Sequence, residues 1–407
     1  MSNPLVSIVI PVYNGSNYMR EAIDSALNQT YENCEVIVVN DGSNDGGKTD
    51  TIARSYGDRI RYFTKENGGV ATAVNLGIKN MRGEYFSWLS HDDIYMPDKI
   101  EKQVQVLENV PNDIEIAHGN FEFLKMPEKK QNKVDWLKFF TKEELEHGAF
   151  APLFLAIHGS TVMIRRSCFE RVGLYREDFP GTQDSEFLFR AMRGHKSCFL
   201  ENCLIIGRLH SEQGQKTMHG FSEEFNQTFI DMASSVKKEE MEILFGTERN
   251  FYYRLYLAFL ENQVSSSILD YLIEKVNAYS VKNLISSDGT EKIMNGKSRL
   301  YIFGAGVYGR KLLFDLKMHN IEINGWIDNN LSKQGKIIEG YRCESLESIL
   351  NYKMDSRIIV SMLSSEEVIN QLKEKGFTDI QTYRDLRNIL KKYEPIYNGG
   401  KIYEMEQ

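Results

Sequence analysis

The 407-residue sequence has few cysteines and no apolar run long enough to span a lipid bilayer. Its five cysteines, at 34, 168, 198, 203 and 343, are scattered and odd in number. They lack metal-site spacing and fit a protein of the reducing cytosol. An apolar run begins almost at the N-terminus, so we expect no signal peptide. We therefore expect a cytoplasmic protein whose membrane contact, where it occurs, is peripheral.

The sequence also lacks an excess of positive charge and a P-loop. The formal net charge is −8, which gives no reason to expect nucleic acid as the main partner. Basic residues cluster only locally, at 125–133 and at Arg165 and Arg166. No Gly-x-x-x-x-Gly-Lys-Ser/Thr run is present. The length allows two or three domains with ample core.

Apolar runs alternate with helical patterns through the first part of the chain. We expect strands at 5–12, 34–39, 60–63 and 84–89, and helices at 18–29, 49–56, 70–80 and 99–107. Strands that alternate with helices in this way predict a parallel sheet built from βαβ units. A further strand is expected at 113–123, a loop at 127–132, and a turn into a strand at 158–166.

Polar residues follow each of the expected strands. They are Tyr13 and Asn14, then Asp41, then Lys65 and Glu66, then Asp92 and Asp93. Carboxyl ends of parallel strands share one edge of a sheet, where ligands bind. These residues suit a nucleotide ligand. Asp41 could accept hydrogen bonds from the base or the ribose, and the ring of Tyr13 could pack on the base. A metal ion would bind the diphosphate. Gly68 and Gly69 allow a tight turn and a close backbone approach.

Asp92 and Asp93 have two interpretations. Adjacent carboxylates at a strand end suit Mg²⁺ or Mn²⁺, which bind carboxylates together with phosphate oxygens. The alternative is a plain helix cap ahead of Pro97, which we expect in the first turn of the following helix. These two residues alone do not decide between a metal site and a cap.

Several of these segments together resemble a known family. The residues are Ser-Ile-Val-Ile-Pro-Val-Tyr-Asn at 7–14, Val-Val-Asn-Asp-Gly-Ser at 38–43, Asn-Gly-Gly at 67–69, Asn-Leu-Gly at 75–77, and the Asp92–Asp93 strand end. In this order they resemble the inverting family 2 glycosyltransferases of the GT-A fold. The resemblance covers roughly the first 215 residues and rests on several ordered motifs.

The resemblance implies transfer of a hexose from a nucleotide-diphosphate sugar, usually a UDP-sugar, with Mn²⁺ or Mg²⁺ at the diphosphate. The donor-binding residues carried over are Pro11, Tyr13, Asn14, Asp41, Lys65, Asn67, Gly68, Asn75 and Asp92. Asp92 matches the metal-binding aspartate of the family's Asp-x-Asp element, with Asp93 nearby. Ser90 stands where the first aspartate of that element is usual. The metal would then depend mainly on Asp92.

Asp184 is the candidate catalytic base. Inversion of configuration at the anomeric carbon of a sugar requires one base, which removes the proton of the acceptor hydroxyl as it attacks. Gln183, Asp184 and Arg190 match the family's frame, in which an aspartate precedes an apolar helix that ends in arginine, with Gln in place of Glu. The alternative role of Asp184 is to cap that helix.

Histidines add weaker candidates. Arg208-Leu209-His210 resembles the family's Arg-x-His, so His210 is a candidate ligand of the metal or diphosphate, or else an ordinary structural histidine. His91 is a weaker candidate beside the carboxylates. His158 and the following 159–161 are expected on the acceptor side.

The second half of the chain has a motif of its own. Gly304, Gly306 and Gly309 lie between an expected strand at 299–303 and a helix at 310–318, and Asp328 ends the next strand, at 321–327. This is the context of a dinucleotide fingerprint. We expect a Rossmann-like module at 297–393, either a nucleotide-type site or a vestigial fold that serves assembly.

The sequence thus predicts an α/β protein with a GT-A catalytic domain at 1–220, a helical connector and linker at 221–296, the Rossmann-like domain at 297–393 and a tail at 394–407. The linker proper is expected at 286–298. The acceptor is expected to be a glycan or lipid-linked glycan of a bacterial surface polysaccharide, and homo-oligomers are allowed. Two alternatives stay open: a non-catalytic nucleotide-sugar-binding subunit, and an NAD-dependent sugar-modifying enzyme that acts through the second domain.

Overall fold

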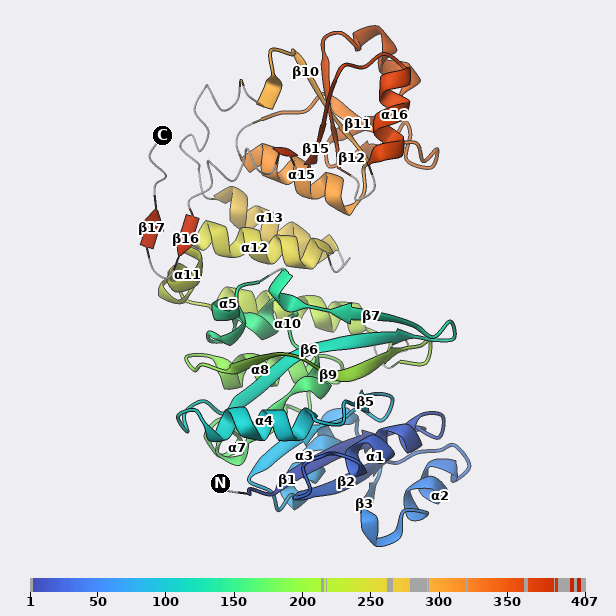
Figure 1. Ribbon diagram of the computed structural model, residues 1–407, viewed down its shortest axis with the longest axis vertical. Helices are drawn as coiled ribbons and strands as arrows, with labels where there is room; N and C mark the ends of the chain where they lie inside the picture. Colours follow the sequence, from blue (N-terminus) through green and yellow to red (C-terminus); the bar gives the residue numbers. More distant parts are fainter. Residues whose placement is uncertain are drawn as a thin grey trace. The chain divides into compact units, whose positions relative to one another are not determined.

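The computed structural model describes residues 3–138, 140–213, 216, 218–261, 266–278, 291, 293–318, 321–361, 365–383, 385–386, 396–398 and 401–403. The chain divides into two compact units, Met1–Ser235 and Val236–Gln407 (Figure 1). Of the predicted linker at 286–298 the structure describes 291 and 293–298, and of the predicted tail at 394–407 it describes 396–398 and 401–403. Every helix among the described residues is too short or too polar to cross a bilayer.

The first unit is built on a nine-stranded mixed sheet in the order β3-β2-β1-β4-β8-β6-β9-β5, with β7 beside β6. Its strands are β1 (Val6–Val12), β2 (Cys34–Asp41), β3 (Arg61–Lys65), β4 (Tyr85–Trp88), β5 (Ile94–Tyr95), β6 (Ile116–Lys125), β7 (Lys130–Val134), β8 (Met163–Arg165) and β9 (Cys198–Leu209). The four strands β1 to β4 run parallel, as the alternating pattern predicts. β8 pairs antiparallel with β4 and β6, whereas β6 and β9 are parallel.

Helices cover both faces of this sheet because side chains alternate along each strand. Ile8 and Ile10 of β1 belong to a core shared with α1 (Met19–Leu27) and α4 (Lys99–Glu108). Val9, between them, faces a second core with α3 (Val70–Asn80), α7 (Arg166–Val172) and α8 (Gln183–Met192). The unit is completed by α2 (Lys48–Arg54), η1 (Gly57–Arg59), η2 (Trp136–Lys138), α5 (Lys142–Glu146), α6 (Phe150–Leu153), η3 (Gly159–Thr161) and α10 (Phe221–Ser235).

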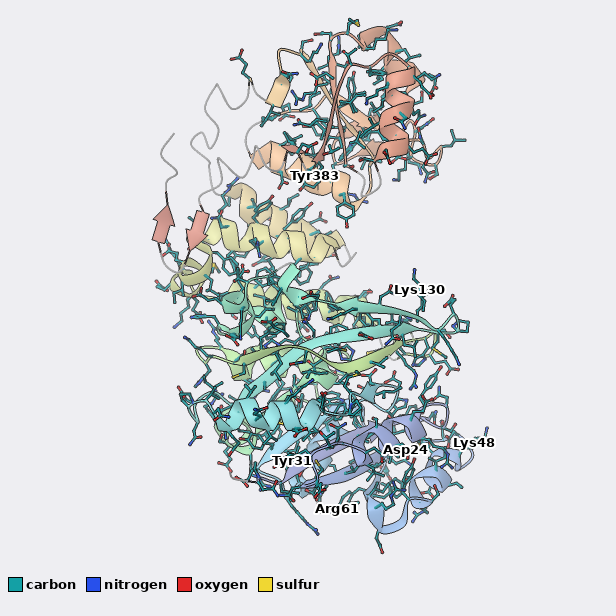
Figure 2. All side chains as sticks on the ribbon, viewed as in Figure 1. Asp24, Tyr31, Lys48, Arg61, Lys130 and Tyr383 are labelled. Atoms are coloured by element: carbon teal, nitrogen blue, oxygen red, sulfur yellow. The ribbon has the colours of Figure 1, made fainter. Side chains whose placement is uncertain are left out.

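Two expectations about local structure are wrong. The loop expected at 127–132 is a short turn followed by β7, which pairs antiparallel with β6 from Phe121–Val134 to Lys125–Lys130. Figure 2 marks Lys130 near the outer end of this hairpin. Exposed lysines keep such an edge strand soluble, and they also hide its strand character in the sequence. Pro97 precedes the N-cap residue Asp98 instead of lying in the first turn of α4.

The second unit has a six-stranded sheet in the order β12-β13-β11-β10-β14-β15. Its strands are β10 (Arg299–Phe303), β11 (Gly325–Ile327), β12 (Ile337–Ile338), β13 (Tyr341–Glu344), β14 (Ser356–Val360) and β15 (Asp379–Thr382), with a separate pair β16 (Ile396–Asn398) and β17 (Lys401–Tyr403). β10 lies parallel between β11 and β14. Its helices are α11 (Lys238–Phe245), α12 (Glu248–Glu261), α13 (Ser266–Ala278), α15 (Val307–Met318), η4 (Glu347–Tyr352) and α16 (Glu366–Glu374).

Sequence patterns also misplaced two features of this unit. The strand expected at 321–327 is limited to Gly325–Ile327, although Ile321 and Ile323 are buried in the core. Ile293, expected in an exposed linker, is fully buried in the same core. An apolar residue within a polar stretch can anchor the end of that stretch to a domain.

Candidate active site

The end of β2 and the turn after β3 are tied together by the carboxylate of Asp41. Its Oδ1 accepts hydrogen bonds from Lys65 Nζ at 2.6 Å and from the Gly68 amide at 3.1 Å. Its Oδ2 accepts from the Gly69 amide at 2.8 Å. Asp41 is 4% exposed, so these donors compensate a charge that would otherwise be costly to bury. The geometry makes Asp41 the organiser of this turn.

The same turn depends on glycine and on Asn67. The Asn67 side chain donates to the Asp41 carbonyl at 2.9 Å. Gly42 has a φ of +69°, and a Cβ there would lie 2.5 Å from the Asn67 amide nitrogen. A residue with a side chain would be strained and would push the turn away.

The end of β1 presents Tyr13, a residue that is 42% exposed. Asn14 has a φ of 50°, and its amide nitrogen donates to Ser43 Oγ at 2.8 Å. Pro11 lies inside β1, opposite Val39 of β2. Because β1 and β2 are parallel neighbours, Tyr13 and Asp41 come from the same edge of the sheet, as predicted. The exposed ring of Tyr13 is free to pack on a planar group.

Asp92 and His210 are brought together at the β4–β5 turn and the end of β9. His210 Nε2 lies 3.0 Å from Asp92 Oδ2. Beneath them, Arg208 donates from Nη1 to the Asp92 carbonyl at 2.9 Å and pairs with Glu21. The Tyr18 ring contacts both the Arg208 guanidinium, at 4.6 Å, and the His210 ring, at 5.0 Å. These contacts hold the imidazole beside the carboxylate.

Asp93 occupies a different environment from its neighbour Asp92. It is 3% exposed, and its Oδ2 accepts from Ser160 Oγ at 2.6 Å while its Oδ1 accepts from the Arg208 amide at 3.2 Å. Burial, together with the charge of Asp92, raises the pKa of Asp93. Both of its carboxylate oxygens already accept hydrogen bonds from the protein, so Asp93 has a supporting role at the β4–β5 turn. Its expected role as a metal ligand stays a prediction.

Asp184 lies in the first turn of α8, facing residues 158–160. Its Oδ1 accepts from the Ser185 amide at 2.8 Å, and a Cβ on Gly159 would lie 3.2 Å from its Oδ2. Burial raises the pKa of Asp184, opposed by the Ser185 hydrogen bond and by the nearby His158. A raised pKa makes a carboxylate a stronger base, which suits proton removal at neutral pH.

The segment 158–160 links the base candidate to the carboxylate pair. His158 Nε2 lies 4.0 Å from Asp93 Oδ2, next to the Ser160–Asp93 hydrogen bond. Burial lowers the pKa of His158, while the charges of Asp184 and Asp92 act against this. His158 thus interacts electrostatically with two carboxylates, Asp184 of α8 and Asp92 of the β4–β5 turn. Segment 158–160 therefore lies next to Asp184 and next to Asp93, the sequence neighbour of Asp92.

The residues at Asp92 and His210 suit a divalent cation. The described residues contain no cluster of three or more His, Cys, Asp or Glu side chains that could hold a metal alone. Mg²⁺ and Mn²⁺ commonly take one or two protein ligands and complete their shell with phosphate oxygens and water. The buried Nδ1 of His210 has no hydrogen-bond partner among the described residues. One carboxylate with one imidazole is a donor set that Mn²⁺ accepts.

The side chain of Asn75 is used in hydrogen bonds to residues 175 and 177. Its amide donates to the Tyr175 carbonyl at 2.8 Å and to Glu177 at 3.0 Å, and accepts from the Tyr175 amide at 3.1 Å. These bonds fasten α3 to the segment that leads into α8. The structure uses Asn75 for support, and its expected contact with the donor stays a prediction.

The glycine-rich loop of the second unit follows β10 as predicted. Gly304 has a φ of +99°, and a Cβ on Gly309 would lie 1.9 Å from the Gly304 carbonyl oxygen, so close packing requires glycine there. Asp328 accepts from the amides of Ala305 and Asn330 and from Lys333 Nζ, each at 2.9 Å. Its carboxylate braces the loop, so binding of ribose hydroxyls would require Lys333 to move.

Sequence reasoning missed several supporting residues of the site. Glu21 and Tyr18 on the α1 side hold Arg208. Ser160 was expected on the acceptor side, but its hydrogen bond to Asp93 was not foreseen. None of them forms a local motif with its partner, so the sequence offered no signal. Glu224 of α10, described below, is a further case.

Comparison with known proteins identifies the first unit. Residues 7–173 match the sequence model of the family described as Glycosyl transferase family 2, and residues 296–383 match one described as C2185-like, N-terminal. An uncharacterized glycosyltransferase of Rickettsia typhi is 41% identical over 298 residues, which are 69% of this chain and 92% of that protein. One of Rickettsia felis is 48% identical over 241 residues, 58% of this chain and 40% of that protein.

The chain spans only 34–42% of the length of three such rickettsial relatives. Among solved structures, a mannosyltransferase of Pyrobaculum calidifontis in complex with GDP-Man and Mn²⁺ is 17% identical, with a TM-score of 0.48 over 69% of this chain and 77% of that one. The family match and the mixed α/β sheet confirm the expected GT-A type fold. On the strength of the family match and the Rickettsia typhi relative, the chain belongs to glycosyltransferase family 2.

Proposed function

We propose that the chain is a metal-dependent inverting glycosyltransferase that moves a hexose from a UDP-sugar to a hydroxyl of a glycan acceptor. The observation that carries this proposal is the segment 158–160, which contacts Asp184 on one side and Asp93, the neighbour of Asp92, on the other. A base and a metal-type carboxylate at one site are what displacement of a nucleoside diphosphate from a sugar requires.

On the donor side, Tyr13 would pack on the uracil ring. Asp41, with the turn that it organises, would face the base and ribose. Asp92 and His210 would hold Mn²⁺ or Mg²⁺, which when bound offsets the negative charge of the diphosphate. Asp93 would keep the β4–β5 turn in place through Ser160 and the Arg208 backbone.

On the acceptor side, Asp184 would take the proton of the attacking hydroxyl. As that O–H bond breaks, the hydroxyl oxygen bonds to the anomeric carbon and the bond from this carbon to the diphosphate oxygen breaks. UDP leaves with the electron pair. Attack in line with the leaving group inverts the configuration, so an α-linked donor gives a β-linked product.

The acceptor and the place of the reaction are part of the same proposal. We propose a glycan or lipid-linked glycan of a surface polysaccharide, reached by peripheral contact with the cytoplasmic face of a membrane. These points rest on family resemblance and not on the chemistry of particular residues.

The test is UDP release from a panel of UDP-glucose, UDP-galactose, UDP-N-acetylglucosamine and UDP-N-acetylgalactosamine, with Mn²⁺ and with chelator. We expect slow release from one donor, abolished by chelator. Mn²⁺-dependent UDP binding without release from any donor, even with an oligosaccharide acceptor mixture, would favour a non-catalytic binding subunit. Absence of UDP binding would overturn the roles of Tyr13, Asp41 and Asp92.

A further inference from the structure

The loop that leads into α8 is held by a side chain from α10. Glu224 Oε1 accepts hydrogen bonds from the Gly181 amide at 3.0 Å, the Thr182 amide at 2.9 Å and Thr182 Oγ1 at 2.7 Å. Thr182 Oγ1 also lies 3.0 Å from Thr228 Oγ1, one turn further along α10. Asp184 follows two residues after Thr182. One carboxylate thus fixes the backbone immediately before the proposed base.

The start of α8 has no ordinary side-chain cap. Thr182 is the N-cap residue of α8, but its side chain makes no capping bond to the helix because the hydroxyl is directed to Glu224. Amide groups at a helix N-terminus need acceptors, and the helix dipole favours a negative charge there. Hydrogen bonds to a carboxylate are also stronger than those between neutral groups. Glu224 therefore binds, from another helix, the N-cap residue Thr182 and the residue before it, so it fixes the backbone that leads into α8.

Packing confirms that α10 and this loop are fitted to each other. A Cβ on Gly181 would lie 2.6 Å from Phe221 Cδ2 and 3.1 Å from Met218 Sδ. A residue larger than glycine would require the Phe221 ring and the Met218 side chain to move. Glu224 can reach the Gly181 and Thr182 amides because of this close approach.

We propose that Glu224 is a positioning residue that holds Asp184 in place for proton removal from the acceptor. This inference rests on the proposed function. Loss of its three hydrogen bonds would let the first turn of α8 shift, and small displacements of a catalytic group are costly because proton transfer needs hydrogen-bond reach. The proposed donor-binding residues lie at the ends of β1, β2 and β9 and on the β4–β5 turn, so donor binding would be little changed.

The experiment compares Glu224→Gln and Glu224→Ala with Glu223→Gln, an exposed neighbour on the same helix. The readouts are UDP release from the active donor, the Kd of UDP with Mn²⁺, the pH profile of turnover, and hydrogen exchange at 181–186 in the full chain. We expect Glu224→Ala to lower kcat by about 10-fold to 100-fold with a UDP Kd within about twofold of the wild type. We also expect faster exchange at 181–186 and a displaced acid limb of the pH profile.

Glu224→Gln keeps one acceptor oxygen and tests the same inference if the alanine variant is poorly folded; we expect it to show a smaller loss in the same direction. Glu223→Gln should match the wild type in every readout. Faster exchange at 181–186 with unchanged kcat and pH profile would overturn the inference and leave Glu224 a structural cap only. A wild type that releases UDP from no donor would overturn the proposed function, and this inference with it.

Discussion

His210 Nε2 lies 3.0 Å from Asp92 Oδ2, although 118 residues separate the two in sequence. Asp92 follows β4 and His210 follows β9, strands that are not neighbours in the sheet. The short β5 bridges the gap, because Ile94 and Tyr95 pair with Ile206 and Ile205 of β9. This pairing brings the turn that carries Asp92 to the strand end that carries His210. A carboxylate and an imidazole in this arrangement are the basis of the metal-binding prediction.

Replacement of Asp92 by Asn should weaken Mn²⁺-dependent UDP binding by about tenfold or more, because an amide oxygen is a much weaker ligand than a carboxylate. Calorimetric titration of UDP with Mn²⁺ and with chelator measures the effect. Asp98→Asn is the matched control, since Asp98 is a half-buried aspartate near the same turn that pairs with Lys102 and makes no side-chain capping bond. UDP affinity that is equal in Asp92→Asn and the wild type would remove Asp92 from the metal site.

Replacement of Asp184 by Asn should lower turnover by about 100-fold or more and leave UDP affinity unchanged, because only the base is removed. In the wild type, the raised pKa of Asp184 should place the acid limb of the pH profile above that of an ordinary aspartate, since the base works only when deprotonated. UDP release measured across pH, with the exposed Asp178→Asn as control, tests both points. Full turnover in Asp184→Asn would show that Asp184 has only a structural role in the first turn of α8.

Buried His118 should make the protein less stable in acid. Burial lowers the pKa of His118 to about 4, against 6.5 for an exposed histidine. Between these values the unfolded chain binds a proton that the folded chain does not, so stability falls as pH falls through this window. The loss due to His118 at pH 5 should be about 2 kcal/mol.

The measurement for His118 is chemical unfolding at pH 7.5 and pH 5. His118→Gln retains a donor toward the Leu145 carbonyl, which lies 3.1 Å from His118 Nε2. Because other buried histidines remain in both proteins, the contribution of His118 is the part of the acid loss that the variant lacks. Equal acid losses in the two proteins would contradict the prediction.

Gly42→Ala should destabilise the turn that Asp41 organises more than Gly46→Ala destabilises its own loop. Both glycines have a positive φ, of +69° and +71°, but only a Cβ on Gly42 would meet another atom, 2.5 Å away at the Asn67 amide. In both variants the strained backbone conformation should lower the free energy of unfolding by about 1 kcal/mol. Gly42→Ala should lower it further because of the clash with Asn67. Thermal unfolding and UDP titration measure the difference. If both variants behave alike, the close approach of Gly42 to Asn67 is not required.

Much of the fold follows from local patterns. The helix expected at 70–80 and the strand expected at 299–303 have the bounds of α3 and β10. Apolar residues there recur with one clear period, and glycine or polar residues mark both ends. The polar strand β7 was missed because its stability comes from pairing with β6, which a local pattern does not show.

Asp92 and Asp93 illustrate the limit for the site. As adjacent carboxylates in the sequence they look equivalent, yet Asp92 faces His210 while Asp93 is buried against Ser160 and the Arg208 backbone. Burial and neighbouring charge set the pKa and the orientation of a carboxylate, and residues from distant parts of the chain supply both. The role of Asn75 also depends on residues far away in the chain, because its side-chain amide donates hydrogen bonds to the Tyr175 carbonyl and to Glu177.

The sequence by itself determined the α/β alternation, the ordered motifs of the family, and the residue types at the ends of β1, β2 and β4, because strand period and turn chemistry are local properties. Tertiary structure alone decided which carboxylate meets His210, that residues 158–160 lie between Asp184 and Asp93, and that Glu224 holds the start of α8. These relations depend on the crossing of strands and helices that are far apart in the chain. Their contacts form only when the sheet and its helices pack together.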